Sequence, residues 1–293
     1  MRNRLSLFTV PYVVWMALLV VAPVIMVVIY AFTSNAGSFT LDNFSDMGAY
    51  VSIFSRSFQL AIVATLVCLL IGYPVAYAMA KEGPGFQRIA MVLIMLPMWM
   101  NFLLRTYSWM SILENNGLLN QLFQQIGLID LYNQIAMHFA SDPAAYVPID
   151  HFQMIGTQGA VVLGMVYNYL PFMILPIYSV LVKLDHSLIE AARDLGASSV
   201  QVFRKVILPL SLPGVLSGIT MVFVPSVSTF AISRLLGGGT QMMLGDLIEQ
   251  QFLGGAYNPQ LGAAIALVMM AIVVVCMLVM NRFGDGEEQA VML

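Results

Sequence analysis

Long stretches without charged residues dominate this sequence. Only 9% of its 293 residues are charged and 60% are hydrophobic, whereas a soluble domain carries about 25% charged residues. A helix needs roughly 20 apolar residues to cross the hydrocarbon core of a bilayer. Six runs reach this length, at about 8–32, 57–80, 89–113 (interrupted by Arg105), 159–182, 208–233 and 261–281. The sequence therefore predicts an all-α membrane protein with six transmembrane helices, forming one domain over residues 1–293.

The distribution of lysine and arginine between the loops predicts the orientation of these helices. With the N-terminus in the cytoplasm, only Arg56 and Arg234 fall in outer segments. The inner segments hold Arg2, Arg4, Lys81, Arg88, Lys183, Arg193, Arg204, Lys205 and Arg282. Both termini and the loop 183–207 are therefore predicted to be cytoplasmic, and 33–56, 114–158 and 234–260 to lie outside.

Two stretches interrupt the simple pattern of spans. Residues 117–129 place apolar side chains at helical spacing but are too few to cross a bilayer, which predicts a helix at the outer interface. The remainder of this outer segment, residues 130–158 with Pro143 and Pro148, is expected to be irregular, and residues 133–158 have no assigned role. In the fifth run, the pairs Pro213-Gly214 and Pro225-Ser226 predict an interrupted helix, and Ser226 becomes a candidate for lining a polar path.

The loop 183–207 is the most charged part of the chain. Ser187 and Glu190 stand at the spacing of a capping box, and Gly196 suits the left-handed residue that ends a helix. They predict a short helix from Leu188 to Leu195, with a second helix beginning at Ser198. The first helix carries an apolar stripe of Leu188, Ala191, Ala192 and Leu195. The stripe fits a partner's groove, but periodicity alone favours a surface helix folded on its own bundle, in which Glu190 serves only as a cap.

A motif in this loop changes that balance. Glu190-Ala191-Ala192 is followed after three residues by Gly196 and after nine more by Val206-Ile207-Leu208-Pro209. This spacing resembles the EAA loop of bacterial ABC-importer permeases, which more often have Ile in place of Val206. The resemblance implies a type I ABC-importer permease fold whose cytoplasmic coupling helix docks into an ATPase. The residues implied in this coupling are Leu188, Glu190, Ala191, Ala192, Arg193, Asp194, Leu195 and Gly196.

The third run carries most of the information about a substrate. On a helix, Trp99, Thr106 and Trp109 would share one side, with Tyr107 and Glu114 at its margin and Arg105 opposite. Aromatic faces with a carboxylate suit an organic cation, although tryptophan and tyrosine also gather at membrane interfaces for other reasons. Arg105 is expected to reach the outer headgroups and to pair with Glu114, Asp246 or Glu249.

The spacing R-x-Y-x-W at Arg105, Tyr107 and Trp109 resembles the polyamine (spermidine/putrescine) branch of these permeases. Residues 190–213 and 235–264 agree with this branch. The resemblance implies import of polyamines through the cytoplasmic membrane. The candidate residues of the substrate path are Trp99, Tyr107, Trp109, Glu114, Ser226, Asp246 and Glu249.

The resemblance also implies partners: two copies of an ABC ATPase, a second homologous permease and an extracytoplasmic polyamine-binding protein, all at a lipid bilayer. None of the three lysines completes a phosphate-binding loop, so ATP and magnesium are expected on the ATPase. No cofactor, metal ligand, catalytic residue or nucleic-acid partner is predicted here. Alternatives are the same machine for another solute (an opine, an iron chelate or thiamine) or a stand-alone secondary transporter. The absence of a carboxylate at mid-membrane depth disfavours the secondary transporter, and the scattered histidines disfavour an enzyme.

Overall fold

The computed structural model describes residues 10–34, 36–139, 146–255 and 257–291, and this part of the chain is helical without a named strand. Its elements are η1 (Ala17–Val21), α2 (Ala22–Ala31), α3 (Asp42–Asp46), η2 (Met47–Tyr50), α4 (Val51–Lys81), α5 (Pro84–Trp99), α6 (Phe102–Leu113), α7 (Leu118–Gln125), α8 (Leu128–Phe139), α9 (Gln158–Leu181), α10 (His186–Asp194), α11 (Ser199–Val202), η3 (Phe203–Ile207), α12 (Leu208–Ser228), α13 (Ala231–Leu236), α14 (Leu244–Leu253) and α15 (Pro259–Val291).

The expected membrane spans correspond to long apolar helices. Within the described residues, five continuous segments are long and apolar enough to cross a bilayer: Val10–Ala31, Asp42–Lys81, Gln158–Leu181, Ser199–Ser228 and Pro259–Met280. A sixth span arises if α5 is counted together with the bent segment Phe102–Gln125. The prediction of an all-helical protein with six spans is therefore confirmed, with one span broken.

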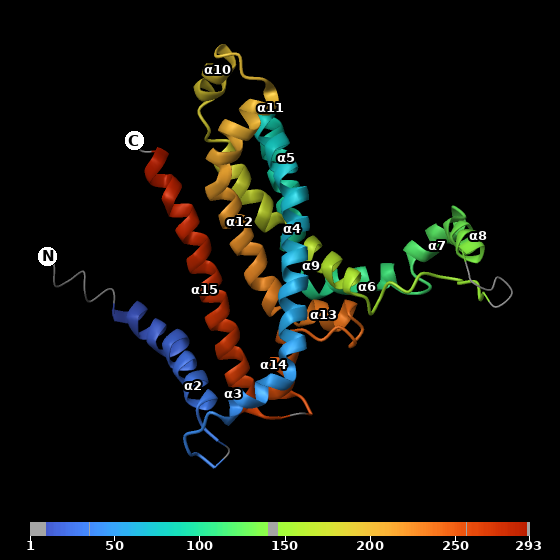
Figure 1. Cartoon of the computed structure of the whole chain (residues 1–293), viewed down its shortest axis with the longest axis vertical. Helices are drawn as coiled ribbons and strands as arrows, with labels where there is room; N and C mark the ends of the chain where they lie inside the picture. The colour runs from blue at the N-terminus through green and yellow to red at the C-terminus, as the bar shows by residue number, and fades with distance from the viewer. Residues whose placement is uncertain (1–9, 35, 140–145, 256, 292–293) are drawn as a thin grey trace.

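The break lies in the third predicted run. The axes on either side of it differ by 89°, because Met100 and Asn101 leave the helical conformation. Asn101 caps the new helix α6, where its side-chain oxygen accepts hydrogen bonds from the backbone N–H groups of Leu103 (2.8 Å) and Leu104 (3.3 Å). The prediction of one continuous helix over 89–113 was wrong, and α6 turns away from the axis of α5 (Figure 1).

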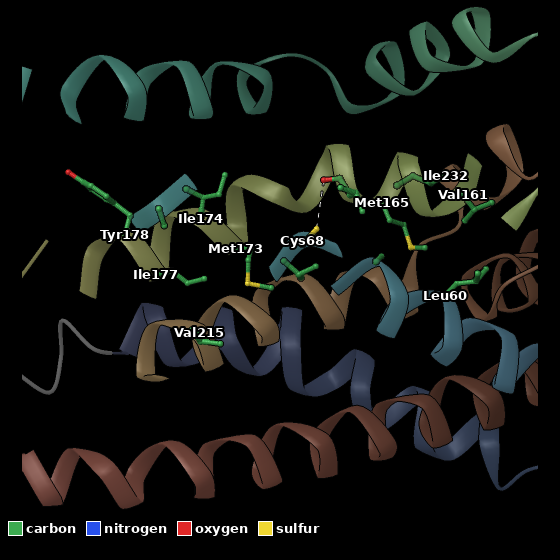
Figure 2. Packing of buried hydrophobic residues seen from close by; sticks show 14 of the residues in the cluster. Leu60, Cys68, Val161, Met165, Met173, Ile174, Ile177, Tyr178, Val215 and Ile232 are labelled. Carbon is green, nitrogen blue, oxygen red and sulfur yellow. Dashed lines mark hydrogen bonds between the residues drawn. The ribbon is translucent and has the colours of Figure 1, made fainter. Parts of the chain in front are cut away.

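The core lies where α4, α9 and α12 pack against one another. Figure 2 shows apolar side chains of these helices facing each other, among them Cys68, Met173 and Val215. The helices approach closely at two glycines. A Cβ added at Gly72 of α4 would lie 2.9 Å from Met173 Cγ, and one at Gly218 of α12 would lie 2.7 Å from Met173 Sδ. Met173 therefore fills the space that two glycines leave between three helices.

Helix α12 differs from its prediction. It continues without interruption from Leu208 to Ser228, although Pro213 and Pro225 lie inside it. Ser226 is fully buried and donates its hydroxyl proton to Val222 O in the same helix at 2.7 Å. The expected interruption at Pro213 and Pro225 was wrong, because the helix ends only at Thr229.

The two ends of the bundle carry different elements. Helices α10 and α11 lie at one end, and α3 and α14 at the other (Figure 1). Helix α15 packs against α2, α12 and α14, so it joins the α14 end to the core. We call these the α10 end and the α14 end.

Helices α7 and α8 form an arm beside the bundle (Figure 1). The helix expected within 117–129 is confirmed as α7, and Gly127, with φ of +72°, makes the turn into α8. Two asparagines bind the returning chain. Asn120 accepts a hydrogen bond from the N–H of Phe152 and donates one to the carbonyl of the same residue. Asn133 makes the same two bonds with Ile149. The expectation of an irregular chain after Ile129 was wrong for α8, which is helical from Leu128 to Phe139, and it is confirmed for residues 146–157 around Pro148. Pro143 lies outside the described residues.

Candidate functional site

Helix α10 is started by a residue that the sequence did not single out. The carboxylate of Asp185 accepts a hydrogen bond from the backbone N–H of Ser187 at 2.9 Å. Hydrogen bonds from the backbone and the side chain of Ser187 lower the pKa of Asp185 below its ordinary value. The predicted capping box of Ser187 and Glu190 was wrong, because the helix begins two residues before Leu188 and Asp185 occupies the N-cap.

The end of α10 agrees with the sequence. Gly196 has φ of +81°, and its N–H donates to Arg193 O at 2.8 Å, while Ala197 N–H donates to Ala192 O at 3.1 Å. Ser198 then starts α11 through a capping box with Gln201. Two short helices joined by a glycine turn were predicted, and this arrangement is confirmed.

The two faces of α10 have different roles in packing. Ile189 and Ala192 face the bundle and pack against its core. Leu188 and Leu195 point away from it, with 47% and 89% of their surface exposed. The predicted apolar stripe is therefore divided: Ala192 belongs to the inner face. The exposed candidate residues are Leu188, Glu190, Ala191, Arg193, Asp194, Leu195 and Gly196, which we call the α10 surface.

A charged cluster lies at the α14 end. Arg234 of α13 contacts two carboxylates of α14: its Nη2 atom lies 2.6 Å from Glu249 Oε2, and its Nε atom lies 3.9 Å from Asp246 Oδ1. Asp246 is only 4% exposed. Its Oδ2 atom accepts hydrogen bonds from the Ser233 hydroxyl and from Met243 N–H (3.1 Å). We call Ser233, Arg234, Asp246 and Glu249 the Arg234 cluster.

Burial sets the electrostatics of this cluster. Desolvation raises the pKa of Asp246, whereas the bonds from Ser233 and Met243 and the charge of Arg234 act in the opposite direction. The side chain of Arg234 is 48% exposed, so this end of the ion pair reaches the surface. Two carboxylates share one guanidinium, which leaves the cluster with an excess of negative charge when both are ionised.

Close backbone packing positions α14. A Cβ at Gly245 would lie closer than van der Waals contact to the carbonyl oxygens of Ser228 and Thr229 at the end of α12. Helix α14 is also bonded to α4, because the N–H of Leu244 donates a hydrogen bond to the Ser57 hydroxyl at 2.8 Å. The carboxylates of α14 are thus held against the ends of two bundle helices.

Helix α6 brings an aromatic pair and a buried cation next to α13, against which it packs. The ring of Trp109 lies edge-to-face on Tyr167 of α9, with centroids 5.4 Å apart. Arg105 is 8% exposed and its guanidinium carbon lies 6.0 Å from the Tyr167 ring centre. Within the described residues, its Nε and Nη1 atoms have no hydrogen-bond partner.

The expected surroundings of Arg105 were wrong. The side chain is buried and does not reach outward, and the structure gives it no ion pair with Glu114, Asp246 or Glu249 among the described residues. The two carboxylates of α14 pair with Arg234 instead.

The structure unites only part of the predicted substrate path. Asp246 and Glu249 lie together on α14, and Trp109 lies on α6, which packs against α13. Trp99 is 72% exposed at the end of α5 and is separated from α6 by the break. Tyr107 and Glu114 are exposed, and Ser226 is hydrogen-bonded within its own helix.

Sequence reasoning missed Ser233, Arg234 and Tyr167 as parts of this region. One signal for Arg234 was present, since it is one of two basic residues in the predicted outer segments. Within the described residues, no group of three His, Cys, Asp or Glu side chains is arranged to hold a metal ion.

Comparisons with known proteins agree with this architecture. Residues 68–286 match the family described as "Binding-protein-dependent transport system inner membrane component". The chain is 34% identical to the spermidine/putrescine transport system permease protein PotB of Haemophilus influenzae over 93% of both chains. It is also 34% identical to PotB of Escherichia coli (strain K12), over 92% of this chain and 93% of the relative.

A solved structure shares the fold. It is that of a bacterial ABC transporter involved in the import of the acidic polysaccharide alginate, with a TM-score of 0.72, 16% identity, and coverage of 96% of this chain and 94% of the other. The family match covers most of the sequence, including the α10 end and the Arg234 cluster. The chain therefore belongs to the family of inner-membrane components of binding-protein-dependent transport systems.

Proposed function

We propose that this chain is the membrane-spanning subunit of an ATP-driven importer that carries polyamines such as spermidine and putrescine. The observation that carries the proposal is the 34% identity to two PotB permeases over more than nine tenths of the chain. The fold shared with an ABC transporter supports the same reading. In this reading the α10 end lies in the cytoplasm, because Lys81, Lys183 and Arg193 are at that end.

The α10 surface is the proposed contact with the ATPase. Its apolar residues, Leu188 and Leu195, project from the bundle, and burial of such side chains in a partner's groove is favourable. Glu190, Arg193 and Asp194 flank them and can fix the orientation of the partner through ion pairs. ATP and magnesium would bind to the ATPase, two copies of which would serve this chain and a second permease. An extracytoplasmic polyamine-binding protein would deliver the substrate at the α14 end.

The Arg234 cluster is the proposed site where a polyamine is attracted. Glu249 and Asp246 hold one shared counter-ion, and Arg234 is half exposed. An ammonium group of the substrate can compete with Arg234 for Glu249, because both form charge-assisted hydrogen bonds to a carboxylate. Trp109 and Tyr167 on the neighbouring helices offer aromatic faces for a second ammonium group.

A transport assay tests the proposal. The chain, reconstituted in proteoliposomes with its proposed ATPase, second permease and binding protein, should accumulate labelled spermidine only with hydrolysable ATP. A matched sample with a non-hydrolysable ATP analogue serves as the control. Spermidine uptake that proceeds equally with the analogue would contradict ATP-driven import. If the complex takes up another solute with ATP but does not take up spermidine, the proposal that polyamines are the substrate is wrong.

A further inference from the structure

A cavity lies between α10 and the bundle, and Arg193 of the α10 surface reaches it as well. It has a volume of about 280 Å³ and is formed by the ends of α4 and α9 together with α10 and α11. Three basic side chains line it, one from α4 and two from α10: Lys81, His186 and Arg193. The hydroxyl-bearing Ser199 lines it as well, and most of the remaining wall is apolar. The cavity therefore combines cationic groups with apolar surface.

These basic groups have no anionic partner in the part of the chain that the structure describes. There, the only ion pairs are those of Arg234 at the opposite end. Lys81 Nζ lies over the Tyr77 ring, 4.2 Å from its centre, and the side chains of His186 and Arg193 form no hydrogen bond with the described residues. No carboxylate lines the cavity. Asp185, the nearest acid in sequence, accepts the N–H of Ser187.

We propose that this cavity binds a phosphate group and that Lys81 and Arg193 are its main charged ligands. Lys81 is the last residue of α4 and Leu181 the last of α9, so the cavity lies where two spans leave the hydrocarbon core. Basic pockets at this depth bind the phosphates of anionic lipid headgroups. The apolar wall provided by Leu181, Leu184 and Ile189 fits the first part of an acyl chain. Free phosphate carries the same negative charge as the lipid headgroup but has no acyl chain to cover this apolar wall.

The site would connect α4 and α10, between which no ion pair is formed in the part of the chain that the structure describes. Lys81 belongs to the bundle and Arg193 to α10, so a phosphate bound by both restrains α10 on α4. The phosphate site depends only on the geometry of the cavity. Assigning the phosphate to a lipid of the cytoplasmic leaflet rests on the orientation given in the proposed function.

Native mass spectrometry of the full chain tests the site. Purified protein is incubated with phosphatidylglycerol or phosphatidylcholine, and the fraction carrying lipid is measured. The unaltered chain should retain phosphatidylglycerol, and Lys81→Gln should weaken retention about fivefold, since each basic residue contributes about 1 kcal/mol to attraction of anionic lipid. Arg193→Gln should have a similar effect. Lys183→Gln is the matched control, because Lys183 lies in the same loop but does not line the cavity.

The other outcomes decide the source of the phosphate or overturn the site. Displacement of the lipid by millimolar inorganic phosphate would support the site with free phosphate as a ligand, whereas resistance would support the lipid. Equal retention in Lys81→Gln, Arg193→Gln and Lys183→Gln, at unchanged melting temperatures, would overturn the proposal. The assay contains neither ATPase nor polyamine, so its failure is distinct from failure of the transport function.

Discussion

The α10 surface and the Arg234 cluster lie at opposite ends of one bundle and are stabilised in opposite ways. Helix α10 is defined by contacts within a few residues: the Asp185 cap, the Gly196 turn and the Ser198 capping box. Its outward side chains are exposed. The Arg234 cluster joins residues of two helices, and α14 is held by one hydrogen bond that Leu244 donates to α4 and by close packing on α12.

This difference indicates how each end responds to change. A substitution in the α10 surface alters what the helix presents without disturbing the core, because Leu188 and Leu195 of its outer face are exposed in the part of the chain that the structure describes. A substitution in the Arg234 cluster alters both charge and packing. We therefore expect the largest effects at the α14 end and the smallest at the cap of α10.

Gly245→Ala should have the largest effect. The added Cβ would overlap the carbonyl oxygens of Ser228 and Thr229, and such overpacking costs about 1–3 kcal/mol. The melting temperature in detergent should fall, and uptake in proteoliposomes should be nearly lost. Gly255→Ala is the control, since a Cβ there meets nothing within 4 Å. Equal melting temperatures for the two variants would show that α14 can shift away from α12.

Asp246→Asn combined with Glu249→Gln should follow. The change removes both carboxylates that Arg234 contacts while keeping the shape of the side chains. Polyamine uptake should fall about tenfold, in line with the loss of a charge-assisted hydrogen bond, and co-purification of the ATPase should not change. Asp130→Asn on α8 removes an exposed carboxylate and is the control. Uptake at the unaltered level in the double variant would remove the cluster from the substrate path.

Glu190→Lys should produce a smaller and separable effect. The residue is exposed, so its reversal of charge should leave the melting temperature unchanged and weaken ATPase association about fivefold, as expected for a surface ion pair of about 1 kcal/mol. Glu82→Lys, an exposed acid in the turn after α4, provides the comparison. If both variants retain the ATPase equally, the α10 surface is not the contact.

Asp185→Ala should have the smallest effect. The hydrogen bonds from Ser187 depress the pKa of this carboxyl, so its capping contribution is present above its ordinary pKa of 3.8 and is lost as the pH falls through the lower folded value. Hydrogen exchange at neutral pH should be faster in the first turn of α10 in the variant. Exchange at Ser198 and Gln201 serves as the internal control. Unchanged exchange in the first turn would assign the start of α10 to another cap.

The same contrast explains how far the sequence could predict this molecule. The spans were readable because charges are excluded from the hydrocarbon core, and the turn at Gly196 was readable because its signals are local. The break at Asn101 was missed, although asparagine is a common N-cap residue, because the apolar run continued through it. A run of apolar residues indicates which part of the chain lies in lipid, but it does not indicate where the helix changes direction.

The candidate site was harder to predict because it depends on tertiary pairing. Asp246 and Glu249 were identified, and Arg105 was expected to pair with one of them or with Glu114. Their partner is Arg234, 12 residues before Asp246 in the chain. The turn between α13 and α14 makes this pair, and no spacing rule indicates it. The division of the α10 stripe at Ala192 also depends on the bundle beneath the helix, which periodicity does not describe.

Met173 has a consequence for movement within the bundle. Three helices meet on this side chain, with Gly72 and Gly218 on either side. A thioether with three rotatable bonds can take several shapes at small cost, whereas a branched side chain there would allow one. The crossing angles of α4, α9 and α12 can therefore change by small amounts while the contact stays filled, so the centre of the bundle can act as a pivot without opening a void.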